Sequence, residues 1–283
     1  MEIKWSSEQL PKMNVRNDKG VTFLTYPVFE EMDWMVHGFS TRLGGVSQGI
    51  YSSMNLSFTR GDEEDSVREN YNRIAAAMGF RAEDIVTSDQ THTSNVRKVT
   101  EKDRGKGITV LRDYTDIDGM ITDIPGLVLA TFYADCVPLY FADPVHHAIG
   151  LSHSGWRGTV RKIGAVTIKK MAEEYGSNPE DIKVAIGPSI CQKCYEVSGD
   201  VIEEFKNAFE RKHWEKLFYV KENGKYQLNL WEANRIIFME SGILKQNISM
   251  PNICTCCNPE FLFSHRASHG KRGNLGAFLG IKK

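Results

Sequence analysis

The sequence predicts an α+β fold in which a central mixed β-sheet, flanked by helices, forms a layered αβ sandwich. Short apolar runs outnumber amphipathic helical segments, and several runs are apolar throughout, as in strands buried on both faces. A strand, helix, strand order over residues 147–187 adds helices to the strand layer. No segment rich in Pro, Gly or Ser divides the chain, so residues 1–283 are predicted to form a single domain.

Helices are predicted where apolar residues recur at helical spacing. Over residues 65–79, Val67, Tyr71 and Ile74 fall on one face, and Gly79 suits the end of the helix. Asp62 or Asp65 is able to cap its start. The other predicted helices cover residues 159–176, 198–210 and 230–242.

Strands are predicted where short apolar runs lie between turn residues. A hairpin is expected over residues 217–230, because Asn223-Gly224 suits a tight turn. The tail, residues 252–276, is expected to mix short strands with a glycine-rich basic loop. The remaining predicted strands cover residues 84–89, 94–99, 107–111, 118–123, 127–133, 136–143, 147–154 and 181–187.

Composition and charge limit the kinds of partner that we expect. Lys plus Arg number 35 against 36 Asp plus Glu, and no basic block is present, so nucleic acid is not the expected partner. The first fifteen residues lack the apolar core of a signal peptide. The longest apolar stretch, residues 126–142, is interrupted by Asp135 and Pro138 and suits buried strands better than a membrane span. We therefore expect a cytoplasmic protein that does not bind membranes, and the oligomeric state stays open.

Three fragments carry residues that bind metals or take protons: SDQTHTSNV around His92, ADCVPL around Cys136 and LSHSGWRG around His153. Each lies near the end of a predicted strand, and strand ends can gather distant side chains at one edge of a sheet. Two imidazoles and a thiolate form a good three-ligand set for zinc and leave a fourth position open. Their spacing matches no short zinc motif, so by spacing alone solvated or core histidines are the simpler interpretation.

The other cysteines form a Cys-x-x-Cys pair, Cys191 and Cys194, and a Cys-x-Cys-Cys group, Cys254, Cys256 and Cys257. A second, tetrathiolate metal site is conceivable from these residues. Ordinary reduced thiols, with one metal site in the chain, are the expectation here, because a disulfide framework does not suit a long cytoplasmic chain.

The combination of motifs is more specific than any one of them. HGFSTRLGGVS (37–47), QTH (90–92), DIDGMIT (116–122), ADCVPL (134–139), HSGWRGT (153–159), IGPSI (186–190) and CTCCNPEFLFSHRAS (254–268) occur in this order. From about residue 36 to its end the sequence resembles the YfiH/YlmD family, whose members have been called laccases or polyphenol oxidases, peptidoglycan editing factors and purine nucleoside phosphorylases. It departs from the usual family pattern at Thr93 and at residues 265–267.

The resemblance implies a zinc site formed by His92, Cys136 and His153, at which copper could also bind. It further implies phosphorolysis of adenosine, inosine, guanosine and methylthioadenosine, with adenosine deamination as a second activity. In that chemistry Cys136 and His153 are catalytic through the metal, which lowers the pKa of a bound water to about 7. Asp135, beside the ligand cysteine, is a candidate for proton transfer, and the alternative is a carboxylate that orients a ligand.

Candidate substrate contacts follow from the same motifs. Arg157, in the glycine turn of HSGWRGT, could add charge to a phosphate site at a helix start. Arg42, in STRLGG, could supply a second anion or ribose contact, and Asn55 and Gln90 have side chains able to bind base or sugar, as do His37 and Asp118. The alternatives are an ordinary glycine turn with a surface arginine for Arg157 and a hairpin turn for Arg42.

Three other functions compete with the phosphorylase. A multicopper oxidase needs more imidazole ligands than eight histidines without a His-x-His pair supply. An amide hydrolase editing peptidoglycan precursors would use Cys136 as nucleophile and His153 or His92 as its base. A structural zinc protein that binds a partner would turn over no nucleoside. Metal content and thiol alkylation separate these classes, because a zinc thiolate is protected by its metal.

Overall fold

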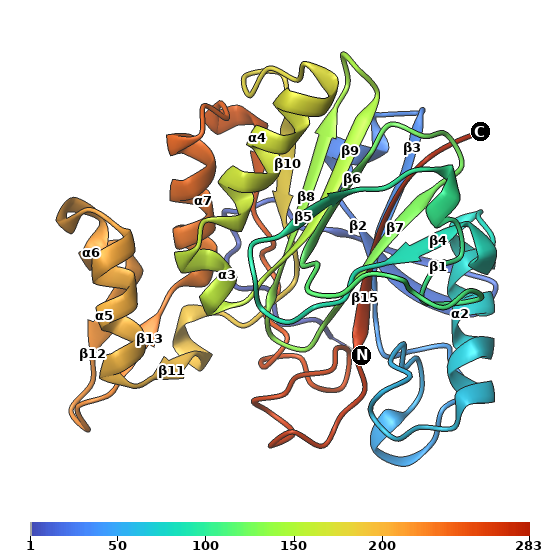
Figure 1. Ribbon diagram of the computed structural model, residues 1–283. Coiled ribbons are helices and arrows are strands. Elements are labelled where there is room, and N and C mark those ends of the chain that lie inside the picture. Colours follow the sequence, from blue (N-terminus) through green and yellow to red (C-terminus); the bar gives the residue numbers. More distant parts are fainter. Residues whose placement is uncertain (1) are drawn as a thin grey trace.

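The computed structural model describes residues 2–283 and has two six-stranded mixed sheets at its centre (Figure 1). The first sheet has the order β1 (Asn14–Asp18), β2 (Val21–Thr25), β3 (Met35–Ser40), β15 (Leu275–Ile281), β7 (Val128–Tyr133) and β4 (Ile85–Thr87). The second has the order β14 (Ile248–Ser249), β10 (Lys183–Ile186), β8 (Val137–Asp143), β9 (Ala148–Ser154), β6 (Gly119–Thr122) and β5 (Val96–Lys98). Most neighbours are antiparallel, whereas β4–β7, β5–β6 and β10–β14 pair in parallel.

The two sheets face each other across a shared core. Leu129 and Leu279 of the first sheet lie in the same buried cluster as Tyr140 and Leu151 of the second. Strand β8 is buried on both faces, because Tyr140 points into this core while Phe141 belongs to the cluster on the opposite side. This double burial accounts for the unbroken apolar character of the run at residues 137–142.

Helices cover the outer faces of both sheets (Figure 1). Helix α2 (Glu64–Met78) packs Val67, Tyr71 and Ile74 on the first sheet, beside Phe278 of β15. Helices α4 (Ile163–Tyr175) and α7 (Leu230–Glu240) cover the second sheet. The remaining helices are α1 (Pro27–Glu30), α3 (Trp156–Val160), α5 (Gly199–Ala208) and α6 (Trp214–Leu217). The order helix, sheet, sheet, helix confirms the predicted α+β sandwich, with two mixed sheets in place of one central sheet.

A small third sheet lies at the periphery, beside α5 and α6 (Figure 1). Its order is β11 (Glu196–Val197), β13 (Tyr226–Leu228) and β12 (Phe218–Val220), and all of its pairs are antiparallel. Strands β12 and β13 form the predicted hairpin, and Gly224 adopts a φ of 75° in its turn, as the Asn-Gly pair requires.

Several predicted elements differ from the structure. Residues 107–111 form a turn instead of a strand, since backbone hydrogen bonds return to Gly105 and Leu111 is 91% exposed. The helix predicted over 159–176 is divided into α3 and α4, because Lys162 takes a left-handed φ of 55°. Helix α2 is capped by Glu63, without a side-chain hydrogen bond, and not by Asp62 or Asp65.

The strands β1, β2 and β3 and the seven-residue β15 were not predicted, although β15 lies in the middle of the first sheet. Strand β15 is flanked by β3 and β7, so its neighbours come from distant parts of the chain. Among residues 2–283, no helix is both long enough and apolar enough to cross a membrane.

Candidate metal centre and adjoining cleft

The three predicted ligands lie together. His92 follows β4 in a loop, Cys136 directly precedes β8, and His153 belongs to β9, which pairs with β8. One ligand atom from each of the three residues lies within 4.8 Å of the others. Zinc bonds of about 2.1 Å to nitrogen and about 2.3 Å to sulfur fit a cluster of this size. The donor set therefore fits a three-ligand zinc site with an open side.

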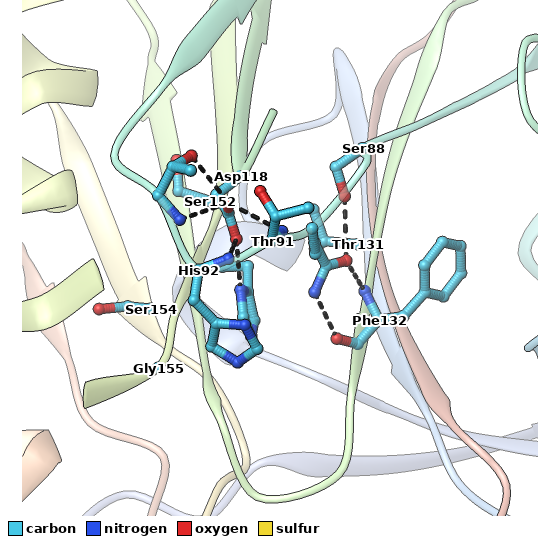
Figure 2. A network of polar contacts seen from close by, with 12 residues as sticks. Ser88, Thr91, His92, Asp118, Thr131, Phe132, Ser152, Ser154 and Gly155 are labelled. Atoms are coloured by element: carbon cyan, nitrogen blue, oxygen red, sulfur yellow. Dashed lines mark hydrogen bonds and ion pairs between the residues drawn. The ribbon is translucent and has the colours of Figure 1, made fainter. Parts of the chain in front are cut away.

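A buried carboxylate holds this cluster in place. Asp118, directly before β6, lies 2.7 Å from Nδ1 of His153 through its Oδ1 atom. The same carboxylate accepts hydrogen bonds from the backbone N–H groups of Thr91, His92 and Thr93. Figure 2 shows Asp118 directed at the loop that carries Thr91 and His92. One side chain thus orients one histidine ligand directly and the other through its loop.

Electrostatics within the cluster favour the ionised forms. Burial alone raises the pKa of the Cys136 thiol, but the imidazoles of His153 and His92 lower it to about 6. Burial likewise lowers the pKa of His153, whereas Cys136 and the hydrogen bond with Asp118 raise it to about 9. Burial raises the pKa of Asp118, and the hydrogen bond from His153 lowers it to about 2. The thiol is therefore ready to act as a thiolate ligand.

Close packing around the cluster requires a residue without a side chain at position 155. A Cβ atom on Gly155 would lie 2.9 Å from Cδ2 of His92 and 3.1 Å from Sγ of Cys136. Gly155 is also the N-cap of α3, and Thr159 returns a hydrogen bond of 2.8 Å to its carbonyl oxygen. The Ser-Gly-Trp-Arg-Gly motif therefore ends β9 and leaves room for two of the predicted ligands, His92 and Cys136.

The cluster opens into a cleft of about 950 Å³, which is large enough for a nucleoside together with a phosphate ion. Its wall includes the aromatic residues Phe58, Tyr71, Tyr114 and Phe132. Four arginines, Arg60, Arg68, Arg112 and Arg272, line it as well. The cleft thus combines a metal-ligand set, flat apolar side chains and positive charge.

Two of these arginines have carboxylate partners and two do not. Arg68 pairs with Glu64 and Arg112 with Asp89, each at 2.6 Å. Within residues 2–283, Arg60 and Arg272 have no ion pair, and Nε of Arg272 is buried without a hydrogen-bond partner. Burial, followed by the charge of Arg60, lowers the pKa of Arg272 to about 10. Two neighbouring cations without a carboxylate partner are a suitable environment for an anion.

The predicted substrate residues occupy different places. Gln90 lines the cleft, but its amide group bonds both the N–H and the C=O of Phe132, at 2.6 and 2.7 Å. Asn55 is buried behind the cleft, and its side chain bonds Ser57, Asp62 and the backbone of Asn274. These amides position residues of the cleft wall.

The predicted cations also lie away from the cleft wall. The Arg42 guanidinium donates to the carbonyl oxygens of Ser52 and Pro259, at 2.9 and 2.7 Å. Arg157 is exposed, stacks on Trp156 and lines a second, smaller groove with Arg161 and Glu204. Helix α3, which follows Gly155, has only five residues. The substrate roles assigned to Arg42 and Arg157 remain predictions.

Asp135 is buried beside the cluster, with both carboxylate oxygens engaged. Oδ1 accepts a hydrogen bond of 2.6 Å from the Thr255 hydroxyl, and Oδ2 accepts one of 2.7 Å from the backbone N–H of Arg266. The backbone φ of Asp135 is 89°, in the left-handed region that residues other than glycine seldom adopt. The geometry favours an orienting role for Asp135, and proton transfer by Asp135 stays a prediction.

Sequence reasoning did not assign the roles of Asp118, Arg60 and Arg272. Asp118 was considered only as a contact to base or sugar, although an acidic residue that orients a metal-bound histidine is a common arrangement. Arg272 lies in the basic, glycine-rich tail between residues 252 and 276. Nothing in the local pattern shows that this tail contributes to the cleft wall beside residues 56–60.

The fold and the site together define an α+β protein in which a cluster of two histidines and one cysteine, able to hold a metal ion, lines a cleft that also contains four arginines. A family model described as "Multi-copper polyphenol oxidoreductase laccase" matches residues 36–282. The chain is 39% identical over 253 residues to purine nucleoside phosphorylase YlmD of Bacillus subtilis, covering 88% of this chain and 89% of that protein. The chain belongs to the YfiH/YlmD family.

Other relatives are similar to this chain over nearly its full length. A purine nucleoside phosphorylase of Staphylococcus epidermidis is 34% identical over 95% of this chain and 100% of that protein. The crystal structure of YlmD from Geobacillus stearothermophilus has a TM-score of 0.89 at 33% identity, covering 96% of this chain and all of that one. That of YfiH from Bacillus licheniformis has a TM-score of 0.88 at 36% identity, over 95% and 99% of the two chains.

Proposed function

We propose that this protein is a zinc-dependent purine nucleoside phosphorylase that acts on adenosine, inosine, guanosine and methylthioadenosine and also deaminates adenosine. The observation that carries the proposal is that one cleft is lined both by the cluster of His92, Cys136 and His153 and by Arg60 and Arg272. The names of the relatives support the same class of reaction.

Phosphorolysis needs a phosphate ion held against C1′ of the nucleoside. A phosphate oxygen bonds to C1′ while the bond from C1′ to the purine nitrogen breaks, and the purine leaves with the bonding electrons and takes up a proton. Arg60 and Arg272 would hold the phosphate, because neither guanidinium is neutralised by a carboxylate and Nε of Arg272 has a free N–H.

The base would lie against the aromatic part of the wall. Phe58 and Phe132 line the cleft, and the two hydrogen bonds from Gln90 fix the backbone that carries Phe132. Flat apolar side chains stack on a purine whatever its substituents, which suits a broad set of purine nucleosides. Gln90 would therefore act on substrate binding through Phe132.

His92, Cys136 and His153 would hold the zinc ion, with Asp118 fixing the orientation of His153. A zinc ion with three protein ligands and an open position polarises oxygen atoms and lowers the pKa of bound water to about 7, which is what deamination of adenosine requires. Copper could use the same ligands. Asp135 would orient Cys136, and proton transfer by Asp135 is a further proposal that Asp135→Asn would test.

Incubation of the purified protein with adenosine, with and without phosphate, tests the proposal by mass-spectrometric product analysis. Adenine and ribose 1-phosphate should form only with phosphate, and inosine in both samples would add deamination. No product in either sample would reject the phosphorylase and favour the amide hydrolase. Rapid alkylation of Cys136 in metal-free protein would support that hydrolase. A protein carrying several coppers that oxidises phenols would favour the laccase.

A variant assigns the phosphate site. Arg272→Ala should raise the KM for phosphate at least about tenfold, because a charge-assisted hydrogen bond worth about 1.5–3 kcal/mol is lost. Its zinc content should be unchanged. Arg16→Ala is the control, because Arg16 pairs with Glu30 away from the cleft. Arg157→Ala is measured in parallel, and a raised KM for phosphate in Arg157→Ala alone would place the phosphate site in the second groove.

We also propose that the protein acts in the cytoplasm, apart from membranes and nucleic acids.

A further inference from the structure

Four cysteines gather at a place separate from the cleft. Cys191 and Cys194 lie on the turn that follows β10, and Cys254 and Cys257 lie on the turn that follows β14. The Sγ atoms of these four residues all lie within 4.8 Å of one another. None of the four lines the cleft. The two Cys-x-x-Cys pairs, which are far apart in the sequence, therefore meet as one thiol cluster.

The dimensions of this cluster suit a tetrahedral metal ion. Zinc bonds to sulfur of about 2.3 Å place the corners of a tetrahedron about 3.8 Å apart. Sγ of Cys194 and Sγ of Cys257 are 3.4 Å apart, too far for a disulfide bond of about 2.05 Å. A four-iron cluster places an iron and sulfide cube between its thiolates and needs a wider cage. Two Cys-x-x-Cys pairs are also the usual ligand pattern of structural zinc.

The surroundings favour a negatively charged complex. The backbone N–H of Cys191 donates to Sγ of Cys254 at 3.2 Å. The Arg266 guanidinium donates to the carbonyl oxygens of Cys194 and Glu196, at 3.1 and 2.9 Å, and so places positive charge beside the thiols. Four thiolates around a divalent cation carry two net negative charges, and both contacts help to offset them.

We propose that Cys191, Cys194, Cys254 and Cys257 bind a second, structural zinc ion as a closed tetrathiolate. Binding releases four thiol protons to solvent and forms four sulfur–zinc bonds, so no redox step is involved. Because all four positions are taken by protein, this ion has no open position for water or substrate. The proposal replaces the expectation that these cysteines are ordinary thiols and that the chain has one metal site.

The second zinc would position the first. Ile190, next to Cys191, donates its backbone N–H to the carbonyl oxygen of Asp135 at 3.0 Å. Thr255, next to Cys254, donates its hydroxyl to the Asp135 carboxylate at 2.6 Å. Both cysteine turns thus hold Asp135, the residue before Cys136. Asp135 has a strained, left-handed φ of 89°. Joining the turns through zinc would stabilise the turn that presents Cys136 to the cleft.

Zinc per chain, measured by plasma mass spectrometry on the full-length purified protein, tests the proposal. The unmodified protein should hold two zinc ions. Cys136→Ala should keep only the ion of the thiol cluster, and Cys194→Ser combined with Cys257→Ser should keep only the ion of the cleft. Cys256→Ser is the matched control and should keep both, because Cys256 lies beside the cluster without belonging to it.

Cobalt provides a second readout that does not depend on the serine variants folding. Cobalt(II) bound to Cys136→Ala should show the intense visible absorption and sulfur-to-cobalt charge transfer of a tetrathiolate. One zinc per unmodified chain together with none in Cys136→Ala would overturn the proposal, as would iron with acid-labile sulfide. Neither readout requires turnover, so failure here and failure of the phosphorylase proposal are distinguishable.

Discussion

At the scale of single residues, Asp118 connects the two predicted histidine ligands, because its buried carboxylate bonds Nδ1 of His153 and accepts from three backbone N–H groups of the His92 loop. We expect Asp118→Asn to weaken zinc binding at the cleft by about 10–100-fold, the usual effect of losing a group that orients a ligand. Competition with a chromogenic chelator measures this affinity. Asp113→Asn, whose exposed carboxylate pairs with Lys106, should bind zinc normally, and equal affinities for both variants would contradict the assigned role.

Gly155 is a second residue whose effect can be predicted, because a side chain at this position would press on two ligands. Crowding a packed site costs about 1–3 kcal/mol, so Gly155→Ala should lower zinc affinity about 10–100-fold while the fold is retained. Chelator competition and circular dichroism measure the two properties. Gly199→Ala is the control, since its nearest neighbour would be 3.9 Å away. Normal zinc binding by Gly155→Ala would show that the ligands do not need this space.

At the scale of elements, the division between α3 and α4 depends on Lys162, which has a left-handed φ of 55°. Left-handed backbone is unfavourable for a residue with a side chain, so Lys162→Gly should raise the free energy of unfolding by about 0.5–1 kcal/mol. Its ion pair with Glu240 is exposed and contributes little. Lys169→Gly, inside α4, should lower the same quantity by about 1 kcal/mol. Urea denaturation distinguishes them, and destabilisation by both would show that the backbone at position 162 is not strained.

At the scale of the whole molecule, residues 100–106 connect the edges of the two sheets, and Asp103 holds this segment together. Its carboxylate pairs with the side chains of Arg97 of β5 and Lys106, at 3.0 and 2.9 Å. The backbone carbonyl oxygen of Lys106 accepts a hydrogen bond from the backbone N–H of Thr87 in β4. Burial raises the pKa of Asp103, but hydrogen bonds from Thr100, Lys106 and Arg97 lower it to about 2. The folded protein therefore prefers the ionised carboxylate.

Because the folded pKa of Asp103 is depressed below the unfolded value, its contribution is complete above about pH 4 and is lost as the pH falls through about 2. We expect Asp103→Asn to lower the free energy of unfolding by about 1–2 kcal/mol at pH 7, with allowance for solvent screening. This difference should shrink between pH 4 and pH 2 in urea titrations. Asp113→Asn should have a much smaller effect, because its ion pair with Lys106 is exposed, and a difference for Asp103→Asn that is independent of pH would refute the account.

Local pattern was sufficient for most elements, whereas the three predicted metal ligands followed from the resemblance to the YfiH/YlmD family. The helical spacing of Val67, Tyr71 and Ile74 predicted α2 to within a residue at each end, and the apolar run around Tyr140 predicted β8. The order of motifs around His92, Cys136 and His153 was enough to expect one metal site, and the three ligand atoms do converge. These features depend on neighbouring residues or on short motifs, which a sequence displays directly.

Only the tertiary structure decided which distant segments became neighbours. Strand β15 completes the first sheet between β3 and β7, Arg272 reaches the cleft from the basic tail, and Cys254 and Cys257 meet Cys191 and Cys194. The sequence by itself determined the α+β class and the ligand types, because periodicity and side-chain chemistry are local. Which remote segments pair depends on how completely whole faces of the sheets and helices are buried. That free energy belongs to the packed molecule and cannot be derived from any one segment of the sequence.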